Sequence, residues 1–188
     1  MKKFISILLV FLIVFSFASC KNKKKDDNSN SVDIEYYAKL GKFPESEFKI
    51  GTSAEEIENS LSSSSSDEDE EDHDHETYQI IEGKSSILID AGSYCYYYLK
   101  DKKEKGISYM LSYEKAFGFE IGTVSTEVKK TLSGLNYKEG EVDRDKAFFV
   151  ISEDASAIEC TISKYTVMFI FENDALCATA IFLTEDWQ

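Results

Sequence analysis

The chain of 188 residues is poor in the side chains on which enzyme catalysis most often depends. It has two histidines, one proline and one tryptophan. Both histidines, His73 and His75, lie in an acidic tract, so no imidazole remains elsewhere to act as a general base. The sequence also lacks a nucleophile elbow and a glycine-rich phosphate loop. It therefore contains no catalytic constellation, and we expect a protein that is not an enzyme.

Positive charge is also scarce. Lysine and arginine together number 21 against 35 acidic residues, which gives a net charge of −14. Such a chain repels phosphate backbones, so nucleic acid is not an expected partner.

The four cysteines are too few and too irregularly spaced for a disulfide framework or a zinc knuckle. Beyond Cys20, we interpret Cys95, Cys160 and Cys177 as small strand residues. The alternation of side chains places Cys160 and Cys177 on opposite faces of their hairpin, so we expect no disulfide between them.

The first 19 residues are typical of a secretion signal. A cationic "MKK" precedes the apolar run "FISILLVFLIVFSFA", which is short for a membrane-spanning helix of about 20 residues. The segment ends in "ASC" and resembles a bacterial lipobox, which implies that Cys20 is acylated and holds the protein on a membrane. The other interpretation is an ordinary signal peptide with an incidental cysteine. We expect an exported, lipid-anchored protein of the cell membrane or cell envelope, with a disordered tether over residues 20–42.

A second low-complexity stretch covers residues 62–76, "SSSSSDEDEEDHDHE". Its composition predicts a disordered, solvated loop. The alternative is weak capture of a divalent cation by Asp72, His73, Asp74 and His75, because carboxylates and imidazoles bind such ions. We expect no other cofactor.

The chain repeats itself at an interval of 71 residues: "FKIGTSAEEIENSLS" at 48–62 returns as "FEIGTVSTEVKKTLS" at 119–133. Each copy predicts a turn at Gly51 or Gly122 and then a short amphipathic helix. Ser53 and Glu56 have capping-box spacing in the first copy, whereas in the second the cap must shift to Thr123 or Ser125.

After each helix the apolar period falls to two, which is typical of strands. The first unit contains "SSILID", "YCYYYL" and "ISYMLSY", and the second contains "KAFFVIS", "AIECTIS", "YTVMFIFE" and "ALCATAIFL", the last two joined by an "END" hairpin turn. The predicted fold class is α+β, with two tandem helix-plus-antiparallel-sheet units over 43–115 and 116–188. Each unit is small enough to be marginal alone, so we expect the two to pack together.

The repeated helix opening "F-x-I-G-T-x-x-x-E-[IV]-x-x-x-L", followed by aromatic strands in a lipoprotein, resembles the tandem-repeat proteins related to the β-lactamase inhibitor protein. It is also similar to the YjgB-type DUF4309 lipoproteins, through the "FGF" strand at 117–119 and the "EVK…L" helix at 127–132. The resemblance covers residues 43–184. It implies the two-unit fold, and members of such groups bind proteins or have no known activity.

A partner site is predicted on the sheet. If Leu99 pairs with Ile107, then Cys95 and Tyr97 share an apolar face suited to packing against the helix. The opposite, outer face then presents the predicted partner-binding residues, which are Tyr94, Tyr96, Tyr98, Met110 and, in the second unit, Met168. The alternative is that these residues belong to the core.

Three functions remain open: a lipid-anchored module that binds a protein or glycan, a metal-collecting lipoprotein and an envelope enzyme. We favour the binding module.

Overall fold

The computed structural model describes residues 32–64, 78–142 and 152–186. The described residues all belong to one compact unit, Ser31–Gln188, and the first 31 residues lie outside the described part. The predicted signal peptide, Cys20 and almost all of the acidic tract therefore also lie outside it. Among the described helices, none is long and apolar enough to span a membrane.

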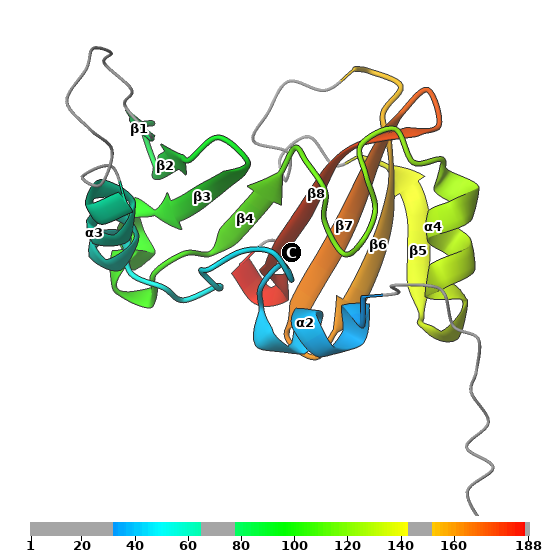
Figure 1. Ribbon diagram of the computed structural model, residues 1–188, viewed down its shortest axis with the longest axis horizontal. Helices are drawn as coiled ribbons and strands as arrows, with labels where there is room; N and C mark the ends of the chain where they lie inside the picture. The colour runs from blue at the N-terminus through cyan, green and yellow to red at the C-terminus, as the bar shows by residue number, and fades with distance from the viewer. Residues whose placement is uncertain (1–31, 65–77, 143–151, 187–188) are drawn as a thin grey trace, which may run out of the picture. The chain divides into compact units, whose positions relative to one another are not determined.

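Within the described residues, eight antiparallel strands form one sheet in the order β1-β2-β3-β4-β8-β7-β6-β5 (Figure 1). The strands are β1 (Gln79–Glu82), β2 (Ser86–Asp90), β3 (Tyr94–Leu99), β4 (Tyr109–Ser112), β5 (Tyr137–Glu141), β6 (Ser156–Ile162), β7 (Tyr165–Glu172) and β8 (Ala175–Leu183). Each half of the sheet is a four-stranded meander, and the last strand of one meander pairs with the last strand of the other. Leu111 of β4 lies opposite Ala180 of β8 at this seam.

The predicted fold class is therefore wrong. The two halves do not build two sheets that pack together, because their strands continue into one sheet across β4 and β8. The described α-helices are only three short ones, α2 (Ile34–Leu40), α3 (Ala54–Ser64) and α4 (Ser125–Thr131). The physical reason is that the last strand of each meander has unpaired backbone N–H and C=O groups along its free side, and the two strands satisfy each other.

The sequence repeat corresponds to a repeated turn. Gly51 and Gly122 have the same left-handed backbone, with φ of 93° and 92°. In the first copy, Gly51 N donates to Ile107 O and Ile107 N donates to Thr52 O, both at 2.8 Å. The second copy makes the same two bonds at 2.8 Å, from Gly122 N to Leu176 O and from Leu176 N to Thr123 O. The turn before α3 is thus joined to Ile107, two residues before β4, and the turn before α4 to Leu176 of β8.

The two repeated helices begin differently. Ser53 Oγ accepts a hydrogen bond from Glu56 N at 3.2 Å before α3, so the predicted cap is confirmed. The N-cap of α4 is Val124, which has no side-chain acceptor, so the predicted cap at Thr123 or Ser125 is wrong. Ile57 of α3 is fully buried, as is its counterpart Val128 in α4. Because α3 extends to Ser64, the predicted disorder is wrong for residues 62–64, and the rest of the predicted loop lies outside the described residues.

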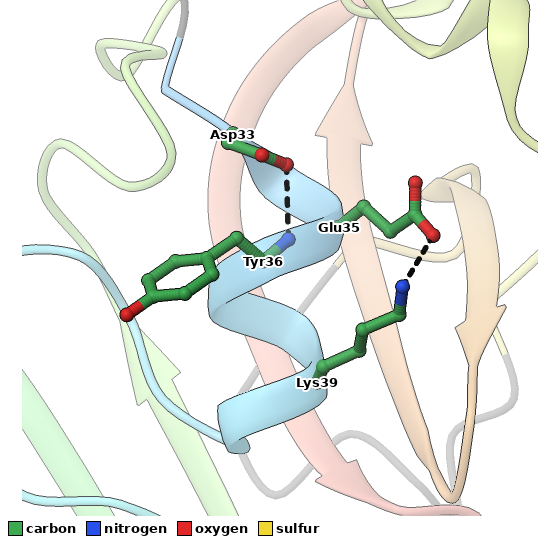
Figure 2. Close-up of polar contacts among 4 residues, drawn as sticks. All are labelled: Asp33, Glu35, Tyr36 and Lys39. Atoms are coloured by element: carbon green, nitrogen blue, oxygen red, sulfur yellow. Dashed lines mark hydrogen bonds and ion pairs between the residues drawn. The ribbon is translucent and has the colours of Figure 1, made fainter.

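Helix α2 was not predicted from the sequence. Asp33 caps it by accepting a hydrogen bond from Tyr36 N at 2.9 Å, and Lys39 pairs with Glu35 at 2.6 Å one turn away (Figure 2). The pair is exposed to solvent, so it adds little to stability.

The predicted tether over 20–42 is therefore too long, because its last part is ordered. Ile34 and Ala38 lie one turn apart on α2 and are buried. This face of α2 packs against β6 and β7, so the apolar pair holds the helix on the sheet.

Candidate functional site

The sheet has two buried faces. We call one the helix-covered face, because its strand residues share a core with side chains of the three helices, such as Ile34, Ile57 and Val128. Its strand residues include Tyr96, Tyr98, Met110, Phe169 and Ile181. The opposite face carries a second core that includes Cys95, Tyr97, Tyr109, Leu111, Met168, Ile170 and Phe182.

The predicted pairing of the tyrosine strand is confirmed, but the predicted face is wrong. Cys95 lies opposite Leu111 and Tyr97 opposite Tyr109, which is the expected register. The helices nevertheless cover the face of Tyr96 and Tyr98, not that of Cys95 and Tyr97.

Tyr96 and Tyr98 are only 3% and 1% exposed. The segment that precedes α3 explains this burial, because the Phe48 ring makes an edge contact with Tyr96 at 5.5 Å between ring centroids. Half-buried Tyr94 stacks on the Phe43 ring, with 5.7 Å between the ring centroids.

The predicted partner-binding residues do not form one surface. Met110 lies on the helix-covered face and Met168 on the opposite face, and both are fully buried. Neither methionine nor the two buried tyrosines can therefore be reached by a partner in the folded chain.

The thiols of Cys95 and Cys177 have low reactivity. Burial, together with the neighbouring Asp90 carboxylate, raises the pKa of Cys95 to about 12. Burial, together with Glu172, raises the pKa of Cys177 to about 11. Both thiols are therefore protonated at neutral pH, which makes them poor nucleophiles and poor metal ligands.

The cysteine prediction is confirmed. Cys160 belongs to the helix-covered core, Cys177 packs against the opposite core, and both are free.

The predicted metal-binding residues, Asp72, His73, Asp74 and His75, lie outside the described residues. In the described ranges 32–64, 78–142 and 152–186, no group of three or more His, Cys, Asp and Glu side chains is arranged to hold a metal ion.

An acidic cleft of about 540 Å³ lies between the start of α4 and strands β5 and β6. Its floor includes buried Ile158 and Phe171. Its carboxylates are Glu139, Glu141, Glu153 and Asp154, and its one lysine, Lys129, pairs with Glu139 at 2.5 Å. This end of the sheet therefore attracts cations, and its exposed carboxylates share the cleft with Ser125 and Ser156.

The two outer edges of the sheet differ in chemistry. Strand β5 at one edge has the polar sequence "YKEGE", and its Glu139 is held by Lys129 of α4. Strand β1 at the other edge has the sequence "QIIE", and all four residues are exposed. Ile80 and Ile81 of β1 are 45% and 50% exposed, although most isoleucines of the sheet are buried. Among the described residues, β1 is the place where exposed apolar side chains coincide with an unpaired strand edge.

Neither edge strand was predicted from the sequence. The paired isoleucines of "QIIE" are a weak strand signal, because β-branched residues favour strands but four residues are too few to show a period. "YKEGE" contains no signal of this kind.

Taken together, these features define a single antiparallel sheet with helices on one face and an exposed apolar edge strand. Comparisons with protein-family models, with curated proteins and with solved structures found no match to this chain. The resemblance to tandem-repeat lipoproteins accordingly stays a prediction from the sequence.

Proposed function

We propose that this protein is a membrane-anchored envelope lipoprotein that acts as a non-catalytic binding module for a protein partner. The observation that carries the proposal is the exposed edge strand β1, with Ile80 and Ile81 half exposed on its two sides. A strand edge with exposed apolar residues is the kind of surface that other polypeptides bind.

The remaining chemistry supports the same conclusion. Both histidines fall within the acidic tract, and the thiols of Cys95 and Cys177 are held protonated by burial. Of the residues that the sequence suggested as a binding surface, Tyr96, Tyr98, Met110 and Met168 are buried in the two cores, and Tyr94 is half-buried. Binding through the exposed edge of the sheet is therefore the activity that we propose.

The anchor is tested by replacing the proposed acylation site. We expect the Cys20→Ser chain to keep its signal segment and to lose labelling by palmitate, because lipoprotein processing requires the cysteine thiol. Ordinary signal cleavage with unchanged detergent partitioning would contradict the anchor.

The binding function is tested by cross-linking in intact cells that produce the full chain. Purification under denaturing conditions should recover, from the membrane fraction, a discrete adduct with one other polypeptide. The Cys20→Ser chain serves as a control for adducts that depend on anchoring. Recovery of the chain without any adduct, under conditions that cross-link known envelope complexes, would contradict a protein-binding function.

A further inference from the structure

We propose that the β1 edge binds an extended segment of a cationic protein by antiparallel strand addition. The lysines or arginines of that segment lie on the C-terminal side of the residues that pair with β1. This inference rests on the proposed function, since it names the site and the partner class of the same binding module.

The register of the first hairpin determines which backbone groups face outward. Gly83 N donates to Ser86 O at 2.9 Å, which closes the β1–β2 hairpin with a hydrogen-bonded pair. Residues of antiparallel strands alternate between bonded and non-bonded pairs, so Ile81 also directs its N–H and C=O toward β2. Ile80 and Glu82 therefore direct theirs toward the free edge, where an added strand can bond to them.

The side chains of β1 extend both faces of the sheet. Ile80 lies opposite Ile89, which belongs to the helix-covered core, and Ile81 lies opposite Leu88, which packs against the opposite core. Each core thus ends in a half-exposed isoleucine. An added strand with an apolar residue on each face would cover both, which favours binding through the hydrophobic effect as well as through the backbone.

Edge strands of soluble proteins are usually protected by lysine, proline or a bulge. β1 contains none of the three, and its register with β2 is regular over all four residues. Strand β5, at the far edge, carries Lys138 and Glu139 and lies beside α4 through the Lys129–Glu139 pair. The difference between the two edges singles out β1 as the one suited to an added strand.

Charge determines the class and the orientation of the partner. The chain carries a net charge of −14, so a second copy is repelled and a cationic partner is attracted. Near the end of β1, Lys100 bonds to Glu82 at 3.1 Å, and Lys84 adds a further positive charge. At the start of β1, Gln79 lies opposite Asp90, so a negative charge stands at this end of the strand. The C-terminal end of an antiparallel partner strand lies beside the start of β1, which is the acidic end. The cationic residues of the partner should therefore lie C-terminal to the residues that pair with β1.

The test uses a substitution that removes one outward N–H. Ile80→Pro deletes a donor that faces the free edge and leaves the bonds between β1 and β2 in place, since proline is tolerated on the open side of an edge strand. Ile80→Ala is the matched control, because it shortens the same side chain but keeps the N–H. Glu141→Pro is the control at the other edge, since Glu141 also directs its backbone away from its neighbouring strand.

The probe is a fluorescent peptide of three threonine-valine pairs followed by four lysines, and its binding to the full chain is followed by anisotropy. We expect binding that weakens roughly tenfold or more for Ile80→Pro and changes little for Glu141→Pro. A peptide with the four lysines placed first, and one with four glutamates in their place, should bind at least about tenfold more weakly than the probe. Added salt should also weaken binding of the probe.

A second measurement does not depend on a protein variant. Alternate N–H groups of an extended peptide point to opposite sides, so two peptides are made, each N-methylated at one of the two alternating sets of nitrogens. The peptide methylated on the side that faces β1 should lose binding, and the other peptide should keep it.

Equal binding by both methylated peptides, by the glutamate peptide or by the Ile80→Pro chain would overturn the inference, as would a failure of the probe to bind. Sedimentation of the full chain in detergent gives one further outcome. A dimer that Ile80→Pro dissociates would make a second copy the occupant and would overturn the cationic partner. If cross-linking finds a partner that the Ile80→Pro chain also captures, the proposed function stands and only the β1 site is wrong.

Discussion

At the scale of single residues, Tyr98 was predicted to bind a partner but is buried in the core. Its ring is 1% exposed on the helix-covered face, and its hydroxyl is buried without a hydrogen-bond partner. Burial, with the Glu58 carboxylate nearby, also raises its pKa, so the hydroxyl stays protonated. The side chain therefore contributes to folding through its ring, while its hydroxyl is a cost.

This separation predicts opposite results for two substitutions. Tyr98→Phe should leave the free energy of unfolding unchanged or raise it by about 1 kcal/mol, because it removes an unpaired polar group. Tyr98→Ala should lower it by about 3–5 kcal/mol, because it leaves a cavity in the core. Urea denaturation measures both, and Tyr36→Phe on exposed α2 is the neutral control. A clear loss of stability in Tyr98→Phe would mean that the hydroxyl has a partner.

At the scale of elements, the turn after the 3₁₀ helix η1 (Lys100–Lys105) depends on a glycine. Gly106 has a φ of 74°, and a Cβ atom there would lie 2.4 Å from Gly51 O and 2.5 Å from Thr52 O. These carbonyls belong to the repeated turn, which Ile107 joins through its own N–H. A side chain at position 106 would therefore push the turn before α3 away from the start of β4.

We expect Gly106→Ala to destabilise the protein by about 3 kcal/mol, from backbone strain together with the clash. Gly92→Ala is the matched control. Gly92 has a similar φ of 78° but no atom within 4 Å of the added Cβ, so only about 1 kcal/mol of strain is expected. Thermal or urea denaturation compares the two variants, and equal losses would show that the close approach to Gly51 is not maintained.

At the scale of the whole molecule, the two buried faces make folding sensitive to alkaline pH. Burial raises the pKa of Tyr94 to about 12, with Glu45 adding to the shift, and that of Cys95 also to about 12. In the unfolded chain a cysteine titrates at about 8.5 and a tyrosine at about 10. Between these values and 12, the unfolded chain releases protons that the folded chain retains.

The stabilisation is therefore fully present below about pH 8.5 and is lost as the pH rises toward 12. We expect the urea midpoint to fall progressively from pH 8 to pH 11. The Cys95→Ala chain should show a shallower fall between pH 8.5 and 10, where the unfolded cysteine titrates but the unfolded tyrosines do not. A midpoint that is constant over this range would contradict the burial of these groups.

The sequence predicted the inner strands well. The strands that begin at Tyr94, Tyr165 and Ala175 were expected within their observed bounds, and the "END" turn has left-handed Asn173 and Asp174. Alternation of large apolar residues is strong in these strands, so the local signal is sufficient. The edge strands β1 and β5 escaped prediction because their pattern is weak and the neighbouring strand supplies most of what holds them.

The sequence by itself determined the inner strands, the register of Cys95 with Leu111 and the repeated turn at Gly51 and Gly122, because these follow from local alternation and backbone geometry. The tertiary structure alone decided which face the helices cover. Both faces of β3 are apolar, so alternation separates Tyr96 and Tyr98 from Tyr97 without indicating which side receives a helix. It also decided that the two meanders share one sheet. The pairing of β4 with β8 is made by backbone N–H and C=O groups. These groups do not depend on the type of side chain, so the sequence pattern does not indicate which strands pair.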